Sequence, residues 1–182
     1  YLAHGVGGGI LLRGSVYRGA SNCAGELGHM VVDPTGPLCH CGHRGCFETF
    51  VSINSLVRNY EARAVVPLEG TDVPQKYREI LRRRDEGNET AREVLHQMED
   101  HLVRGLGNVC NVLNPEFVML GGMGAEFSDA LLEEIQEMLR CQVLELAAKK
   151  LRVVRASMGI DDSALLGATL VAMDCYARTT VG

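Results

Sequence analysis

Three cysteines, Cys39, Cys41 and Cys46, lie close together in one glycine-rich segment of the chain. Glycines let a short loop turn back on itself, so three thiolates can converge on one point. Zinc binds a tetrahedron of sulfur and nitrogen ligands in proteins. The spacing therefore predicts a zinc site and requires a fourth ligand nearby.

Three histidines are candidates for this fourth ligand: His29, His40 and His43. His40 lies between two of the cysteines, where we expect its side chain to point away. His43 lies in the turn before the last cysteine and could compete. We favour His29, which ends the polar segment Glu26-Leu27-Gly28-His29. Four protein ligands leave no open position, so we expect a structural metal and not a catalytic one.

Two carboxylates are expected close to this site. Glu26 and His29 are three residues apart, so one helical turn would bring both to the same side. Glu48 follows Cys46 by two residues, so closure of the metal loop would draw it toward His29. Together these groups could bind the hydroxyls of a small sugar-like ligand. Alternatively, Glu26 and Glu48 only form hydrogen bonds to the metal ligands and so anchor the metal loop. The spacing does not distinguish these two interpretations.

Two glycine-rich segments could contact a nucleotide. Gly5, Gly7 and Gly8 belong to a run whose backbone N–H groups could approach a phosphate. A glycine run between strands is also a common hairpin device. Gly121 and Gly122 end a short apolar segment, where a base or ribose could lie against the backbone. They could equally serve close packing of a strand on a helix.

Composition indicates a globular protein. The chain has 182 residues, of which 46% are hydrophobic and 23% charged, and its net charge is −5. We expect one domain or two small lobes, a cytoplasmic location and no membrane partner, because no apolar run approaches a membrane span and no signal peptide is seen. The basic run Arg82–Arg84 precedes acidic residues and is interpreted as a solvated helix end. The isolated cysteines are expected to be buried: Cys23, Cys110, Cys141 and Cys175.

Hydrophobic periodicity and turn signals predict alternating strands and helices. Strands are predicted within residues 5–18, joined by a turn at 13–15, then at 117–120 (buried) and 151–155. Helices are predicted at 48–63, 74–85, 88–112, 128–147 and 161–176, with a linker at 65–73. Such alternation is typical of an α/β protein in which helices pack on a layered sheet.

Taken together, the motifs resemble those of the ROK family, which contains sugar-responsive repressors and sugar kinases. The resemblance rests mainly on Gly5–Gly9, Tyr17–Ala20, Ala24–His29 and the pattern Cys39-x-Cys41-Gly42-x-x-Gly45-Cys46-x-Glu48, and continues more weakly through residues 111–116, 120–122 and 165–168. It implies the two-lobed, actin-like (ribonuclease-H-like) ATPase fold. Residues 1–182 would form the C-terminal lobe, a mixed sheet flanked by helices with a zinc loop at 29–48. The N-terminal lobe and any DNA-binding domain would lie outside this chain.

The resemblance also implies roles for individual residues. It implies that His29, Cys39, Cys41 and Cys46 bind zinc, and that Glu26, His29 and Glu48 hold the hydroxyls of a sugar or amino sugar. The family's catalytic Asp lies upstream, and no Asp here occupies a matching motif. We therefore expect no catalytic residue in this chain and no phosphorylation by it alone. Homodimers or larger homo-oligomers are common in the family and are expected here.

One departure from the family pattern favours a regulator. Kinase members usually have Gly-Thr-Gly before the glycine run, where the threonine serves the ATP phosphates, but this chain has Ala3-His4-Gly5. The segment Thr49–Ser52 also looks more like that of the repressors. We favour the effector-binding domain of a sugar-responsive transcriptional regulator, which would contact DNA only through an upstream winged helix. The alternatives are the C-terminal lobe of an ATP-dependent hexokinase or glucokinase, which would bind ATP, and a zinc-stabilised interaction module with a vestigial pocket.

Overall fold

The computed structural model describes residues 1–157. The helix predicted for residues 161–176, the motif at 165–168 and Cys175 lie outside these residues. The described elements are, in chain order, β1 (Leu11–Leu12), β2 (Ser15–Val16), the 3-10 helix η1 (Leu27–His29), α1 (Glu48–Val51), α2 (Ile53–Glu61), α3 (Val73–Asp85), α4 (Glu89–Leu113), β3 (Phe117–Leu120), the 3-10 helix η2 (Met123–Glu126), α5 (Asp129–Gln142), α6 (Glu145–Ala148) and β4 (Arg152–Arg155).

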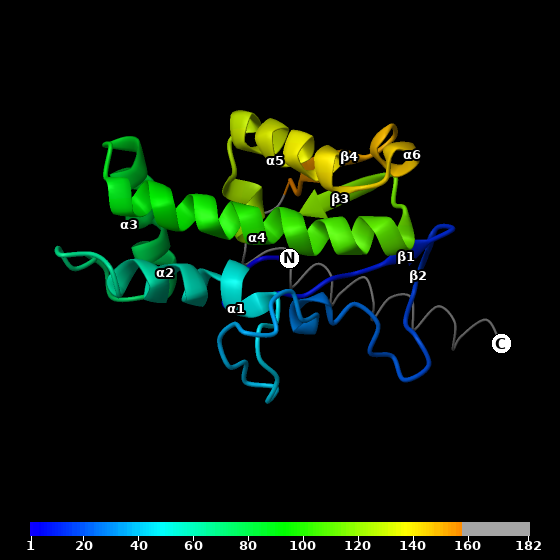
Figure 1. Cartoon of the computed structure of the whole chain (residues 1–182), viewed down its shortest axis with the longest axis horizontal. Helices are drawn as coiled ribbons and strands as arrows, with labels where there is room; N and C mark the ends of the chain where they lie inside the picture. Colours follow the sequence, from blue (N-terminus) through cyan, green and yellow to red (C-terminus); the bar gives the residue numbers. More distant parts are fainter. Residues whose placement is uncertain (158–182) are drawn as a thin grey trace, which may run out of the picture.

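Helix α4 forms the centre of the molecule. It begins after Asn88, whose side chain accepts a hydrogen bond from the Ala91 N–H, and it ends at Asn114 in the left-handed conformation. Both are common ways to satisfy the end of a helix. Figure 1 shows α5 along one side of α4 and α1 and α2 along the other, and all three helices contact it. The helix predicted at 88–112 is therefore confirmed, and it is buried on several sides.

Two predicted helices are each divided in the structure. The helix predicted at 48–63 breaks at Ser52, whose backbone is extended and whose side chain accepts the Ser55 N–H at the start of α2. The helix predicted at 128–147 breaks at Val143. There Asn111 of α4 accepts the Leu144 N–H and donates to the Gln142 carbonyl. A polar side chain thus replaces helical hydrogen bonds at each break.

The strands form two separate pairs in the described residues. β1 and β2 make a short antiparallel hairpin, and β3 and β4 pair in parallel, so the mixed sheet is not seen there as one sheet. The prediction that the strand at 117–120 is buried is wrong for one face: Phe117 and Met119 are exposed, whereas Leu120 is buried. Side chains alternate across a strand, and α5 packs on this pair.

Phe47 ties the cysteine-rich loop to the core. Its ring is buried and lies against Gly105 of α4, where a Cβ atom would come within 2.3 Å of the ring. Because Phe47 directly follows Cys46 and precedes Glu48, this contact fixes both of these residues over the central helix. A glycine at position 105 is therefore required for the approach of the loop.

Two further expectations concern the burial of the isolated cysteines and the absence of a membrane-spanning helix. Cys110 is buried as predicted, but Cys23 and Cys141 are exposed, so the expectation is wrong for these two. Cys23 follows Asn22, and Cys141 lies between Arg140 and Gln142, so polar neighbours accompany both thiols on the solvent side. Among the described helices, none is both long and apolar enough to cross a membrane.

Candidate functional site

The loop that carries the cysteines is folded by a tight turn and a close backbone crossing. Asp33 accepts hydrogen bonds from the Thr35 N–H and hydroxyl, which lower the pKa of its carboxyl group. Gly45 has a φ of 70° and passes so close to Asp33 that a Cβ atom would overlap the Asp33 carbonyl. Only glycine fits this approach. The crossing returns Cys46 to the side of the loop where the other cysteines lie.

The four predicted metal ligands come together. The ligand atoms of His29, Cys39, Cys41 and Cys46 lie within 4.8 Å of one another. The Cys41 and Cys46 Sγ atoms are 3.6 Å apart, and Cys39 Sγ is 3.7 Å from His29 Nδ1. A tetrahedral zinc ion with ordinary bond lengths would place sulfur pairs about 3.8 Å apart and sulfur–nitrogen pairs about 3.6 Å apart. The cluster could therefore hold a metal ion and is compatible with structural zinc.

The three thiols lie in different surroundings. Hydrogen bonds from the His43 backbone and side chain lower the pKa of Cys41 to about 6. Burial raises the pKa of Cys39, and raises that of Cys46 to about 12. Because zinc binds the thiolate form, loading the site must release protons from the two buried thiols.

The two remaining histidines of the loop both lie close to the cluster. His43 Nδ1 is 3.5 Å from Cys41 Sγ. The group of four side chains that could hold a metal nevertheless contains His29 and not His43. The expectation that His40 points away is wrong: its Nδ1 lies 3.8 Å from Cys39 Sγ and 2.9 Å from Glu48 Oε1. The Gly42 N–H donates to the Cys39 carbonyl. His40 lies within this turn, where neighbouring side chains do not point to opposite sides as they do in a strand, so it can lie on the same side as Cys39.

Glu48 connects the cysteine loop to the glycine run. It is the first residue of α1, and its Oε2 accepts the Val6 N–H at 3.2 Å. Its Oε1 lies 3.6 Å from Cys39 Sγ. At Gly5 a Cβ atom would come within 2.7 Å of the carboxylate. The residue predicted to bind a ligand is thus held from two sides.

Glu26 lies on the side of the His29 ring that faces away from the cysteines. Its Oε2 is 3.9 Å from His29 Nε2, and its side chain is 69% exposed. This distance is too long for a hydrogen bond. The opposite ring nitrogen, Nδ1, faces Cys39. The ring of His29 therefore stands between the cysteines and Glu26.

The glycines predicted to contact a nucleotide make close backbone contacts. The Gly7 and Gly8 N–H groups donate to the carbonyls of Tyr1 and Gly25. The Gly121 carbonyl accepts the Leu2 N–H, and a Cβ atom at Gly122 would overlap the Leu2 carbonyl. These contacts favour the hairpin interpretation of the glycine run and the packing interpretation of Gly121 and Gly122. Nucleotide binding by Gly5, Gly7, Gly8, Gly121 and Gly122 stays a prediction.

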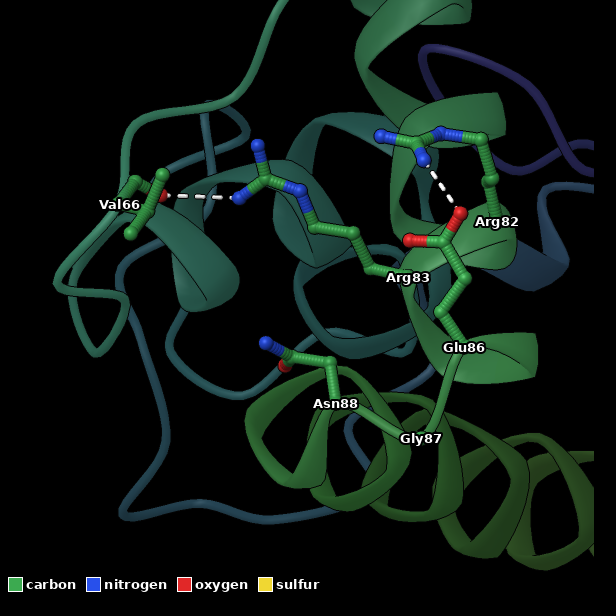
Figure 2. A pocket seen from close by; sticks show the side chains of 6 residues that line it. All are labelled: Val66, Arg82, Arg83, Glu86, Gly87 and Asn88. Atoms are coloured by element: carbon green, nitrogen blue, oxygen red, sulfur yellow. Dashed lines mark hydrogen bonds and ion pairs between the residues drawn. The ribbon is translucent and has the colours of Figure 1, made fainter.

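A pocket of about 440 Å³ lies away from these residues, between the end of α3 and the start of α4. Figure 2 shows that its guanidinium groups are engaged, Arg83 with the Val66 carbonyl and Arg82 with Glu86. Arg83 also donates to Tyr60 and to the Pro67 carbonyl, so it fastens the linker to α3. The pocket is lined by Val66, Arg82, Arg83, Glu86, Gly87 and Asn88.

Comparison with known proteins decides the family. The model of the ROK family matches residues 1–174. The chain belongs to the ROK family. The resemblance predicted from the motifs is thus confirmed, and membership implies the actin-like ATPase fold, with which the mixed helices and strands of the described residues agree.

Relatives include both enzymes and regulators. Over 177 residues the chain is 28% identical to a glucokinase of Thermotoga maritima, covering 93% of this chain and 56% of the relative. Over 172 residues it is 30% identical to the DNA-binding transcriptional dual regulator NagC of Escherichia coli strain K12, covering 90% of this chain and 40% of the relative.

Among solved structures, the chain is similar to a ROK hexokinase from Thermus thermophilus. The TM-score is 0.80 and the identity 29%, and the match covers 100% of this chain and 57% of that one. In all three comparisons the chain spans about half the length of the protein it matches. The similarity to these proteins therefore establishes the family and the fold. Because kinases and regulators are matched alike, it does not distinguish between these two functions.

Proposed function

We propose that this chain is the sugar-binding effector domain of a ROK-family transcriptional regulator, with structural zinc bound by His29, Cys39, Cys41 and Cys46. The observation that carries the proposal is the position of His29 between the cysteine cluster and Glu26, with Glu48 beside the same cluster. A histidine that binds a metal through Nδ1 keeps its proton on Nε2. That N–H and the two carboxylates form a mixed set of donors and acceptors suited to the hydroxyls of a hexose or amino sugar.

The regulator is favoured over the kinase by the position of His4. Its Nδ1 lies 3.3 Å from Asn54 Oδ1, and Asn54 Nδ2 donates to the His4 carbonyl at 2.9 Å. Asn54 of helix α2 therefore holds His4 in place. His4 occupies the position at which kinase members carry the threonine that contacts the phosphates. A held imidazole offers no hydroxyl at this point and adds bulk to the loop.

In such a regulator, sugar binding changes the balance between conformations that bind DNA and conformations that do not. A ligand shifts this balance only by its difference in affinity for the two forms. DNA contacts would come from a part of the protein outside this chain. We further propose a cytoplasmic homodimer or larger homo-oligomer as the working assembly.

Calorimetry on the full-length, zinc-loaded protein tests the sugar site. The panel is glucose, mannose, N-acetylglucosamine and N-acetylmannosamine, and the variant is Glu48→Ala. Loss of a hydrogen bond to a charged group should weaken binding by about tenfold or more. Glu133→Ala, an exposed residue of α5, is the matched control and should bind as the wild type does. Unchanged affinity in both Glu26→Ala and Glu48→Ala contradicts the assignment.

The second candidate is the C-terminal lobe of an ATP-dependent sugar kinase. It is favoured by the match to the ROK hexokinase structure over the whole of this chain. ATP consumption by the full-length protein that depends on an added hexose would establish this function. Sugar-dependent release of DNA without ATP consumption would establish the regulator.

A further inference from the structure

The two carboxylate oxygens of Glu48 have different partners. Oε2 points toward the glycine run and accepts the Val6 N–H in a partly buried contact. Oε1 lies 2.9 Å from His40 Nδ1 and 3.6 Å from Cys39 Sγ, which belongs to the metal cluster. The Glu48 side chain is 15% exposed, and that of His40 is 72% exposed. The backbone therefore fixes one oxygen of Glu48, and the solvent-exposed His40 side chain covers the other, which also lies beside Cys39.

His40 also lies against the other side chain proposed to bind the ligand. The rings of His29 and His40 meet edge to face, with 5.1 Å between their centroids and an interplanar angle of 71°. His40 is thus the residue that touches both His29 and Glu48 from the solvent side. A ligand that reaches the Glu48 Oε1 atom must share it with His40 or displace His40 from it.

We propose that His40 is a further residue of the ligand site, which occupies Glu48 Oε1 in the ligand-free protein and gives it up to a hydroxyl group of the bound sugar. This inference rests on the proposed function, because it requires that Glu48 bind the ligand. His40 then acts as a built-in competitor that sets the affinity of the site. Its side chain needs only to rotate outward into solvent, while the Val6 N–H keeps the carboxylate in place.

The size of the effect follows from the exposure of the contact. An exposed pair of this kind contributes little, since water and salt screen it and the side chain loses rotational freedom. Removing such a competitor should tighten ligand binding by roughly two- to fivefold. The weakness of the contact also fits its role, because a stronger one would prevent the ligand from displacing it.

Another arrangement of the same residues makes a different prediction. His29, His40 and Glu48 also bring one ligand atom each within 4.8 Å of one another, as a metal site would require. If His40 held a metal, its replacement would release metal from the protein. Under our proposal, replacement of His40 leaves the zinc content unchanged, because Cys39, Cys41, Cys46 and His29 supply all four ligands.

The test compares His40→Ala with the wild type in the full-length protein, with zinc content and sugar affinity both measured. The control is Arg44→Ala, an exposed residue of the same loop whose side chain reaches the Gly36 carbonyl. We expect His40→Ala to keep its zinc and to bind the best sugar of the panel roughly two- to fivefold more tightly. Arg44→Ala should match the wild type. Loss of zinc, or an affinity in His40→Ala that is unchanged or weaker, overturns the inference.

A second readout follows displacement itself. With isotope-labelled histidine, the ring nitrogen signals of His40 should change when the sugar saturates the wild-type protein, whereas those of His96 on α4 should not. An unchanged His40 signal in a saturated protein overturns the inference and leaves the sugar site intact. If the zinc-loaded wild type and His40→Ala bind no sugar of the panel, the proposed function itself has failed.

Discussion

The Nδ1 atom of His29 lies 3.7 Å from the Sγ atom of Cys39, and the opposite nitrogen of the same ring lies 3.9 Å from a Glu26 oxygen. One imidazole therefore lies between a cluster suited to a metal and the Glu26 carboxylate, which is suited to hydroxyl groups. Binding of Nδ1 to the metal would fix both the tautomer and the direction of the ring. Four predictions follow from this arrangement and from the helices that support it.

The first prediction concerns the metal. Cys41→Ser should remove zinc and lower stability strongly, because the binding free energy of a closed structural site is also folding free energy. We expect loss of several kcal/mol, measured as thermal or denaturant unfolding with zinc content determined in parallel. Cys141→Ser is the matched control, since Cys141 is an exposed thiol on α5. Equal zinc content in both variants would contradict the ligand assignment.

The second prediction separates ligand binding from stability. Glu26 is largely exposed and contacts His29 only at long range, so Glu26→Gln should leave zinc content and melting temperature unchanged. It should still weaken sugar binding by about tenfold, since a charged acceptor is lost. Calorimetry and unfolding on the same preparation measure both effects. A variant that loses zinc as well would indicate that Glu26 only anchors the metal loop.

The third prediction tests how the loop is fastened to the central helix. Gly105→Ala places a methyl group against the Phe47 ring and should cost about 1–3 kcal/mol of unfolding free energy. Gly107→Ala is the control in the same helix, since its Cβ would lie 3.3 Å from Gln142 Cβ and 3.9 Å from Leu139 Cδ1, with no overlap. Alanine's better helix propensity should offset that contact. Equal stability of the two variants would show that Phe47 does not fix the loop.

The fourth prediction concerns pH. Burial, and after it the charge of Glu134, raise the pKa of Glu99 on α4 to about 7, while the neighbouring His96 and Arg84 oppose the shift. A carboxyl group with a raised pKa in the folded state destabilises the protein when it ionises. This cost is absent below the unfolded pKa of about 4.3 and is complete above about 7.

Glu99→Gln should therefore stabilise the protein at pH 8, by of the order of 1–2 kcal/mol, and the gain should shrink as the pH falls toward 5. Denaturant unfolding of the wild type and the variant at several pH values measures the gain. Glu133→Gln, on the exposed side of α5, should show no such trend. A gain in Glu99→Gln that is constant with pH would indicate a packing effect instead.

The metal cluster could be predicted from the sequence because its ligands are chemically distinctive and close in the chain. Cys39, Cys41 and Cys46 need only a short loop to meet, and the structure brings His29 to them. Zinc binding by these four residues stays a prediction. The family resemblance was likewise correct, since it rested on the spacing of several such motifs. Long helices such as α3 and α4 were found from their periodicity, because their buried faces repeat over many turns.

Other features depend on contacts that spacing does not reveal. The break at Ser52 depends on one side chain capping α2, and the break after Gln142 depends on Asn111 from a different helix. The orientation of His40 depends on a turn within the cysteine loop. The exposed face of β3 depends on which elements cover the strand pair. In each case a tertiary contact or a local turn overrides the pattern read from neighbouring residues.

Elemental analysis of the purified full-length protein tests the central claim most directly. The account predicts zinc in stoichiometric amount, retained through dialysis and lost in Cys41→Ser together with sugar binding. Metal-free protein that still folds and binds sugar with unchanged affinity would contradict it, because His29 and the two carboxylates would then be positioned without the metal.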